Sequence, residues 1–284
     1  MSSQKPSLHY DDIIYRLQKR GGISVYWNKV TMSIDERLKF FIVRRTSGFL
    51  PILYLERYFP VFSVANVFHS SYFRFNLNPK SKNIVTVYDF MYELGYLRTK
   101  GGFINILQKQ IALRQADVII CISASTRRDL LRLYPNLPKS PRIEVVYLDS
   151  SLSEAANELP EDSTLAEIIE GPSYVLFVGK RSSYKNFDAL AIAFGQSSLC
   201  SQGYKLLCVG SPFSDSEKEQ LSELGLLNQT LSLQGVTESE LKVLYSQAFA
   251  LVYPSFYEGF GLPPLEAMIC GCPVISSISS SIPE

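Results

Sequence analysis

Two glutamates, Glu258 and Glu266, bracket a turn rich in glycine and proline in the stretch YEGFGLPPLEAM, which runs from residue 257 to residue 268. A carboxylate can accept two hydroxyl hydrogen bonds at once, which suits the diol of a sugar or a ribose. Gly259 and Gly261 allow the backbone to approach a ligand closely. The two prolines predict the start of a helix with Glu266 in its first turn, and a helix N-terminus attracts phosphate. The stretch therefore predicts a binding site for a sugar, a phosphate and a ribose, although Glu266 could also simply compensate the helix dipole.

A second candidate site contains two cations. Arg181 and Lys185 belong to the stretch VGKRSSYKN, which follows the apolar run YVLFV. Arginine can hold a diphosphate with a bidentate fork, and lysine can hold it as a point charge. The alternative is that both are solvated loop cations.

Several other kinds of site find no support in the sequence. It contains neither G-x-G-x-x-G nor the P-loop pattern G-x4-G-K-[ST], which argues against an NAD enzyme and a P-loop NTPase. We find no pair of aspartates at a suitable strand end for a metal and no nucleic-acid recognition motif. The five cysteines show no C-x2-C spacing, so they are expected to be reduced side chains and not metal ligands. We therefore expect no metal and no other cofactor.

The elements that must position these residues alternate between strand and helix. Short apolar runs rich in β-branched residues are separated by longer amphipathic segments, which is typical of parallel sheets covered by helices on both faces. The predicted strands are 8–11, 39–45, 62–69, 83–90, 117–123 and 142–148, then 174–179, 205–210, 231–235, 250–255 and 273–277. The predicted helices are 23–34, 103–116, 126–134, 186–197, 216–225, 237–247 and 262–271.

A chain of 284 residues is long for one domain and suits two. We predict an α/β protein with an N-terminal domain at 1–150 and a C-terminal domain at 171–284, joined by a polar, acidic connection at 148–173 that holds one short helix. A doubly wound domain of six βα units needs roughly 180 residues, so the second domain is expected to be incomplete.

The charge is uneven along the chain although the net charge is only +1. Between Arg37 and Lys82 there are eight Lys or Arg residues and one Glu, a balance of +7, interleaved with aromatic residues. This segment could be an ordinary amphipathic surface, or it could rest on anionic lipid headgroups. With no signal-peptide-like or membrane-spanning run, we expect a cytoplasmic protein, peripheral on the inner face of the membrane.

The motifs together resemble glycosyltransferase family 4, a retaining family with the GT-B fold of two Rossmann-like, doubly wound domains that face a cleft. Glu258 and Glu266 match its Glu-x7-Glu motif, and PSFYEGFGLPPLEAMICGCPVISS, VGKRSSYKN, CISASTRRDLL and GGISVY resemble the family in the same order along the chain. The likeness therefore covers most of the sequence.

The resemblance implies roles for individual residues. Arg181 and Lys185 would bind the diphosphate of a nucleotide-sugar, Glu266 would bind its ribose, and Glu258 would bind the sugar hydroxyls. The backbone amides around 260–262 would contact sugar and phosphate. The residues with implied backbone roles are Phe260, Gly261, Leu262, Gly21 and Gly22, the last two bringing a loop of the first domain against the diphosphate.

The acceptor side departs from the family pattern. Many relatives carry a His-Asp pair after the fourth strand, and here Tyr88 stands in place of the histidine while Asp89 remains. Tyr88 can still hydrogen-bond a sugar, but it cannot carry the same charge near neutral pH. His69 ends a predicted strand on the same side, where it could contact the acceptor or serve only the structure.

The resemblance implies hexosyl transfer from a GDP- or UDP-sugar to a hydroxyl group of a glycan or lipid-linked acceptor, in polysaccharide or lipopolysaccharide synthesis. Two alternatives from other classes stay open. One is a truncated, non-catalytic remnant that binds nucleotide-sugar weakly or not at all. The other is a GT-B enzyme of different chemistry, such as a sugar-nucleotide epimerase, which product analysis would separate from a transferase.

Overall fold

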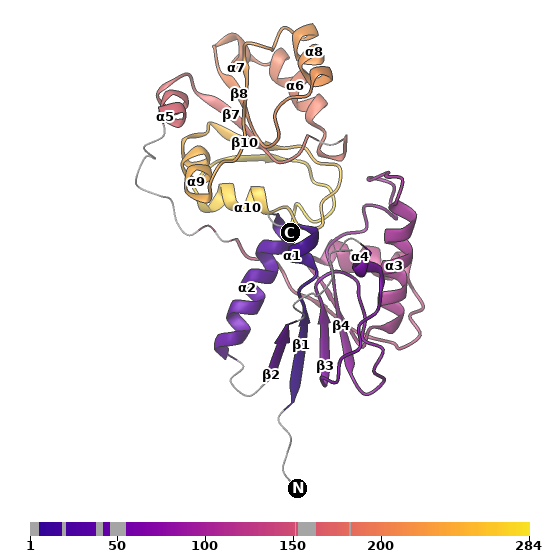
Figure 1. Ribbon diagram of the computed structural model, residues 1–284. Helices are drawn as coiled ribbons and strands as arrows, with labels where there is room; N and C mark the ends of the chain where they lie inside the picture. The colour runs from indigo at the N-terminus through magenta and orange to yellow at the C-terminus, as the bar shows by residue number, and fades with distance from the viewer. Residues whose placement is uncertain are drawn as a thin grey trace. The chain divides into compact units, whose positions relative to one another are not determined.

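The computed structural model describes residues 6–18, 21–37, 42–45, 55–150, 152, 163–181 and 183–284. The chain divides into two compact units, one of Met1–Asp149 with Glu284 and one of Ser150–Pro283 (Figure 1). Each unit has its own parallel sheet.

The first unit contains six parallel strands in the order β2-β1-β3-β4-β5-β6. All six predicted strands of this half are present, with bounds that differ from the predicted ones at one or both ends. They are β1 (Ser7–Asp11), β2 (Ile42–Arg45), β3 (Val67–Ser70), β4 (Lys82–Val87), β5 (Val118–Cys121) and β6 (Arg142–Val145). The helical segments are α1 (Ile14–Leu17), α2 (Gly22–Arg37), η1 (Glu56–Tyr58), α3 (Gly102–Gln115) and α4 (Ala124–Leu133). The helices predicted around 23–34, 103–116 and 126–134 are confirmed, whereas α1 and η1 are too short to give a periodic signal.

The strand order of the first sheet reverses between β1 and β3. The chain passes from β1 to β2 on one side and then returns to β3 on the other, and Tyr10 pairs with His69 across this junction. In an open α/β sheet, helices leave in opposite directions at such a junction, so a crevice forms at the carboxyl ends of the two strands. This is the expected ligand-binding place of the first unit.

The second unit contains five parallel strands in the order β11-β10-β7-β8-β9. They are β7 (Tyr174–Val178), β8 (Lys205–Val209), β9 (Thr230–Leu233), β10 (Ala250–Tyr253) and β11 (Val274–Ser276). Its helical segments are α5 (Ser163–Glu170), η2 (Ser183–Lys185), α6 (Phe187–Gln196), α7 (Ser198–Ser201), α8 (Asp215–Glu223), α9 (Glu238–Gln247) and α10 (Leu262–Ile269). Here the order reverses between β7 and β10, which are direct neighbours.

Two hydrophobic clusters cover the two faces of the second sheet. Alternating side chains of β7 supply both, because Leu176 belongs to one cluster and Val175 and Phe177 belong to the other. This is the period of two that a strand imposes. The predicted connection at 148–173 contains helix α5, whose Leu165 is buried in the first of these clusters. That helix therefore belongs to the core of the second unit.

Candidate functional site

Two loops meet at the carboxyl ends of β7 and β10, where the second sheet reverses its strand order. The amide of Phe256 donates to the carbonyl of Tyr184 at 2.8 Å, and the side-chain amide of Asn186 donates to the carbonyl of Pro254 at 3.3 Å. Asn186 has φ 56°, a left-handed conformation that asparagine tolerates better than most residues. These bonds fix the loop after β7 to the loop after β10.

The centre of this site is a buried ion pair. Lys185 Nζ lies 2.6 Å from Glu258 Oε1, and the two side chains are only 10% and 8% exposed. Lys185 Nζ also donates to the hydroxyl of Tyr253 at 2.7 Å and lies 4.7 Å from the centre of its ring. The sequence placed Lys185 and Glu258 in separate motifs, and the adjacency of β7 and β10 brings them into contact.

A serine-rich segment after β11 holds the loop that carries Glu258. The Glu258 amide donates to Ser280 Oγ at 2.7 Å, and Ser281 Oγ makes 2.9 Å contacts with the carbonyls of Glu258 and Phe260. Ser277 Oγ donates to the carbonyl of Ser255 at 2.6 Å. These serines were not among the predicted site residues, because a run of serines after a strand is typical of an ordinary loop.

Arg181 is not a solvated loop cation. Its Nε donates to Glu217 Oε1 at 2.7 Å, and its side chain is only 3% exposed. The guanidinium also lies 4.4 Å from the ring centre of Phe213 and donates to two carbonyls of the loop after β8. Burial would raise the Glu217 pKa, but hydrogen bonds from Arg181 and Ser214 lower it below its usual 4.5. Arg181 therefore ties the loop after β7 to helix α8, and among the described residues its Nη1 has no hydrogen-bond partner.

A close backbone contact joins the ends of β7 and β8. A Cβ atom added to Gly210 would lie 2.5 Å from the carbonyl oxygen of Gly179, closer than real Cβ contacts come. Gly179 itself has φ 126°, which favours glycine. The two glycines allow the loop that carries the cations to lie directly against the neighbouring loop.

Helix α10 begins as the sequence predicted, with one correction. Gly261 is its N-cap and has φ 95°, a conformation that explains the glycine, and Leu262 is its first residue. Glu266 is the fifth residue of the helix and therefore lies in the second turn, so the prediction that it lies in the first turn was wrong although the predicted start of the helix was right. The prolines at 263 and 264 lack N–H groups, so Leu262 is the sole amide donor among the first three helical residues.

Glu266 is held by a buried tyrosine. The hydroxyl of Tyr245 in α9 donates to Glu266 Oε2 at 3.0 Å. Burial raises the pKa of Glu266 above its usual 4.5, and the Tyr245 hydrogen bond offsets part of this increase.

In the first unit, two of the predicted acceptor-side residues share a cavity of about 210 Å³. Tyr88 and Asp89 line it together with residues that include Tyr72 and Lys109. Tyr88 is buried, accepts from Trp27 Nε1 and donates to the carbonyl of Ser71 at 3.0 Å. Burial raises its pKa well above 10, so its hydroxyl stays protonated.

The other predicted residues of this unit lie elsewhere. His69 is buried, makes a 2.9 Å contact with Thr86 Oγ1, and packs edge-on to Trp27 at 4.7 Å between ring centres. Burial lowers its pKa to about 3, so it is neutral at physiological pH. Gly21 precedes α2 and Gly22 opens it. The roles of these three residues toward a ligand stay predictions.

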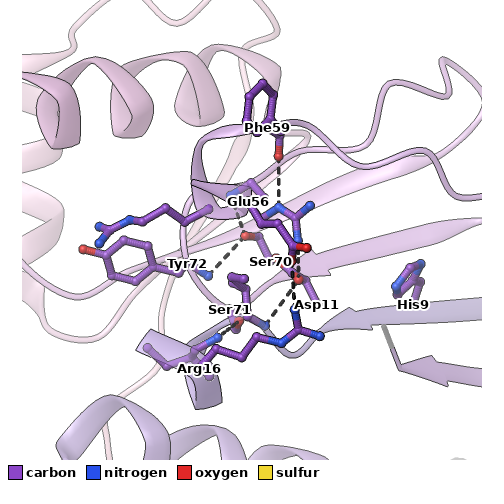
Figure 2. A network of polar contacts seen from close by, with 12 residues as sticks. His9, Asp11, Arg16, Glu56, Phe59, Ser70, Ser71 and Tyr72 are labelled. Carbon is purple, nitrogen blue, oxygen red and sulfur yellow. Dashed lines mark hydrogen bonds and ion pairs between the residues drawn. The ribbon is translucent and has the colours of Figure 1, made fainter. Parts of the chain in front are cut away.

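A polar network that our sequence analysis missed lies where β1 and β3 end (Figure 2). Asp11 Oδ1 accepts from Arg74 at 3.0 Å, and Ser70 Oγ accepts from the amides of Tyr72 and Arg74. Burial raises the pKa of Asp11 from 3.8 to about 6, against the opposing effect of Arg74. Asp11 also lines a cavity of about 350 Å³ with Trp27 and other residues of α2. The network fixes the reversal point of the first sheet.

Within the described part of the chain, no group of three or more His, Cys, Asp or Glu side chains is placed to hold a metal ion. The same residues include no helix that is both long and apolar enough to cross a bilayer.

Comparison with known proteins links the site to a family. Residues 161–284 match the model of the family "Glycosyl transferases group 1". The chain is 29% identical over 170 residues to the O-antigen chain mannosyltransferase RfbU of Salmonella typhimurium, covering 59% of this chain and 44% of that protein. It is 33% identical over 178 residues to the O-antigen chain mannosyltransferase B of Escherichia coli, covering 61% and 46%. The chain thus matches less than half of the length of these two relatives.

Solved structures share the fold over nearly the whole chain. Sucrose-phosphate synthase from Thermosynechococcus elongatus has a TM-score of 0.69 at 18% identity, covering 98% of this chain and 82% of that one. Anabaena HepE in complex with UDP-glucose has a TM-score of 0.64 at 15% identity, covering 97% and 81%. The predicted α/β fold of the GT-B glycosyltransferases is therefore confirmed. The residues that match the group 1 glycosyltransferase model, 161–284, include the buried Lys185–Glu258 pair.

Proposed function

We propose that this protein transfers a hexosyl unit from a nucleoside diphosphate sugar to a hydroxyl group of a glycan or lipid-linked acceptor, with retention at the anomeric carbon. The observation that carries the proposal is the Lys185–Glu258 pair at the reversal point of the second sheet. Nucleotides bind at such points because loops and helix N-termini converge there. The names of the relatives support a role in polysaccharide synthesis, and they make mannose the first sugar to test.

Each group of the site has a part in this proposal. Lys185 stabilises the negative charge that grows on the departing diphosphate, and the Gly261 turn lets backbone approach it. Arg181 adds a second positive charge near the diphosphate, and the Nη1 atom of its guanidinium has no hydrogen-bond partner among the described residues. Glu258 accepts hydrogen bonds from the sugar hydroxyls, and Glu266 accepts them from the ribose. Phe260 and Leu262 contribute backbone groups on the two sides of Gly261.

The reaction breaks the bond between the anomeric carbon and the diphosphate oxygen. The acceptor oxygen bonds to the same face of that carbon, and its proton passes to the departing diphosphate. In this proposal no side chain forms a covalent intermediate. It also requires no divalent metal, because Lys185 and backbone amides stabilise the leaving group, so activity should persist in EDTA.

The test is a thermal titration of the chain with GDP, UDP and ADP and with their sugar conjugates, including GDP-mannose and UDP-glucose, in EDTA. A ligand at 100 times its Kd stabilises the folded state by about 2.7 kcal/mol. A shift with one base, lost in Glu266→Ala and Lys185→Ala, supports the proposal. A cooperative transition that no nucleotide moves would refute it for this chain. Analysis of the products with an acceptor then separates transfer from epimerisation.

Contact with a membrane surface is the second part of the proposal. The predicted basic segment 37–82 lies partly outside the described residues, which omit 38–41 and 46–54. Within its described part, Phe59 is 63% exposed and Phe62 is 74% exposed. Exposed aromatic rings among cations suit the headgroup region of an anionic membrane, which would place the protein on the inner face of the cytoplasmic membrane. Sedimentation with vesicles of anionic and of neutral lipid tests this, and equal binding to both would refute it.

A further inference from the structure

Two buried tyrosines outside the Glu-x7-Glu motif are linked to its glutamates, one directly and one through Lys185. Tyr253 ends β10 and is 1% exposed, and Tyr245 lies in α9 and is fully buried. The hydroxyl of Tyr253 accepts from Lys185, the ion-pair partner of Glu258, and the hydroxyl of Tyr245 donates to Glu266. A buried hydroxyl with a defined partner fixes the orientation of that partner, and losing it leaves a buried polar group unpaired.

The protonation of both hydroxyls is clear from their surroundings. Burial, and then the adjacent carboxylate of Glu258, raise the pKa of Tyr253 well above 10. Burial and the carboxylate of Glu266 do the same for Tyr245. Both tyrosines are therefore protonated at neutral pH, and each can act as a hydrogen-bond donor to its carboxylate.

Tyr253 also contacts Lys185, the cation of the site. Its hydroxyl accepts from Lys185 Nζ at 2.7 Å, while Lys185 Nζ lies 2.6 Å from Glu258. The Tyr253 hydroxyl and the Glu258 carboxylate thus contact the same ammonium group. Its ring lies beside Gly261, where an added Cβ would be 3.7 Å from the ring edge. Tyr253 therefore contacts the cation, which is paired with the carboxylate, and lies beside the glycine turn of the site.

Tyr245 reaches its glutamate from a different element. Helix α9 packs against α10, and both Tyr245 and Glu266 lie on this contact. The bond uses Oε2, one of the two carboxylate oxygens of Glu266. The tyrosine limits the rotation of the carboxylate that is proposed to bind the ribose.

We propose that Tyr253 and Tyr245 are positioning residues, each of which orients one glutamate of the motif toward one end of the donor. Tyr253 acts on the sugar and phosphate end through Glu258 and Lys185, and Tyr245 acts on the nucleoside end through Glu266. This inference rests on the proposed function, because it assumes a nucleoside diphosphate sugar as the ligand.

The test compares three Tyr→Phe variants. Tyr253→Phe and Tyr245→Phe keep the rings and remove only the hydroxyls. Tyr174→Phe is the matched control, because Tyr174 is also buried and its hydroxyl donates to the carbonyl of Leu244 at 2.9 Å, so its loss affects the fold and neither glutamate. Affinities for the nucleoside diphosphate and for the matching nucleotide-sugar are measured by calorimetry, with the base identified on the wild type.

We expect Tyr253→Phe and Tyr245→Phe each to bind the nucleotide-sugar about tenfold more weakly than the wild type. This is the usual effect of one lost hydrogen bond to a charged group. Tyr245→Phe should weaken nucleoside diphosphate and nucleotide-sugar by the same factor. Tyr253→Phe should weaken the nucleotide-sugar more than the diphosphate. Tyr174→Phe should bind both within twofold of the wild type even though its melting temperature falls. Equal losses in all three variants, or wild-type affinity in Tyr253→Phe and Tyr245→Phe, would overturn the inference.

A second readout needs no ligand. Because the Tyr245 hydrogen bond lowers the pKa of Glu266, Tyr245→Phe should raise that pKa further, as measured by carbon NMR of the labelled carboxyl. An unchanged titration would overturn the role of Tyr245. If the wild type binds no nucleotide while this titration moves as expected, the proposed function fails and the link between Tyr245 and Glu266 stands.

Discussion

Lys185 and Glu258 should be strongly coupled energetically. The effect of replacing one of them on the free energy of unfolding of the second unit should depend on whether the other is present. At 2.6 Å the attraction between the two charges is about 6 kcal/mol for an effective dielectric constant of about 20. Removing both charges from water costs a comparable amount, so the net contribution of the intact pair is small. Removing one partner leaves the other charge buried without compensation, because the side chains are only 10% and 8% exposed.

We therefore predict that Lys185→Met and Glu258→Gln each lower the free energy of unfolding by about 3–5 kcal/mol. The double variant should lose less than the sum of the two single losses, by a coupling energy of about 2–3 kcal/mol. The measurement is urea unfolding of the four proteins, followed by far-UV circular dichroism. The protein has one tryptophan, Trp27, whose fluorescence follows the first unit separately.

The matched control is the exposed ion pair Arg142–Glu144, whose side chains are 77% and 43% exposed. Solvent screens such a pair, so its variants should each change stability by less than about 1 kcal/mol and show almost no coupling. Additive losses for Lys185→Met and Glu258→Gln, within about 0.5 kcal/mol, would refute the burial argument. That result would mean that water reaches the pair in the folded protein.

Three further predictions concern the structure around the sites. Gly210→Ala should lower the free energy of unfolding, measured by thermal unfolding, by about 1–3 kcal/mol, because its Cβ would lie 2.5 Å from the Gly179 carbonyl oxygen and the backbone must move. A decrease below about 0.3 kcal/mol would contradict this contact. The folded-state pKa of Asp11 is raised from 3.8 to about 6, so the folded protein keeps a proton that the unfolded chain has released between pH 4 and 6. The free energy of unfolding should therefore fall by up to about 3 kcal/mol as the pH rises through this window, and Asp11→Asn should lack this component in urea titrations at several pH values. Ser123→Ala should destabilise by about 1 kcal/mol, because Ser123 Oγ caps α4 by accepting from the amide of Thr126 at 3.0 Å, and a neutral result by calorimetry would exclude that cap.

The sequence predicted most of the secondary structure because strands and helices leave different hydrophobic periods. The strand Tyr174–Val178 is apolar at every position, as a strand buried on both faces requires. The turn before α10 was also readable, since only glycine adopts φ 95° at residue 261 without strain. The start of that helix at Leu262 was predicted as well, but Glu266 lies in its second turn and not in the first.

The sequence identified Glu258, Glu266 and Lys185 as candidates, because carboxylates and cations beside glycine turns imply sugar and phosphate chemistry. It could not pair them. The strand order places β10 next to β7, and this brings Lys185 into contact with Tyr253, which lies 68 residues further along the chain. Strand order depends on the packing of whole helices over a sheet, which no local pattern records.

The tertiary structure alone decided which of the polar residues have internal partners. Arg181 looked equivalent to Lys185 in the loop after β7, but only the fold places Glu217 against its guanidinium. The tyrosines that hold the two glutamates read as ordinary core residues in the sequence, since a buried tyrosine and a buried phenylalanine give the same apolar pattern. The chemical types of the site residues are thus written in the sequence, and their orientations come from contacts between segments that only folding brings together.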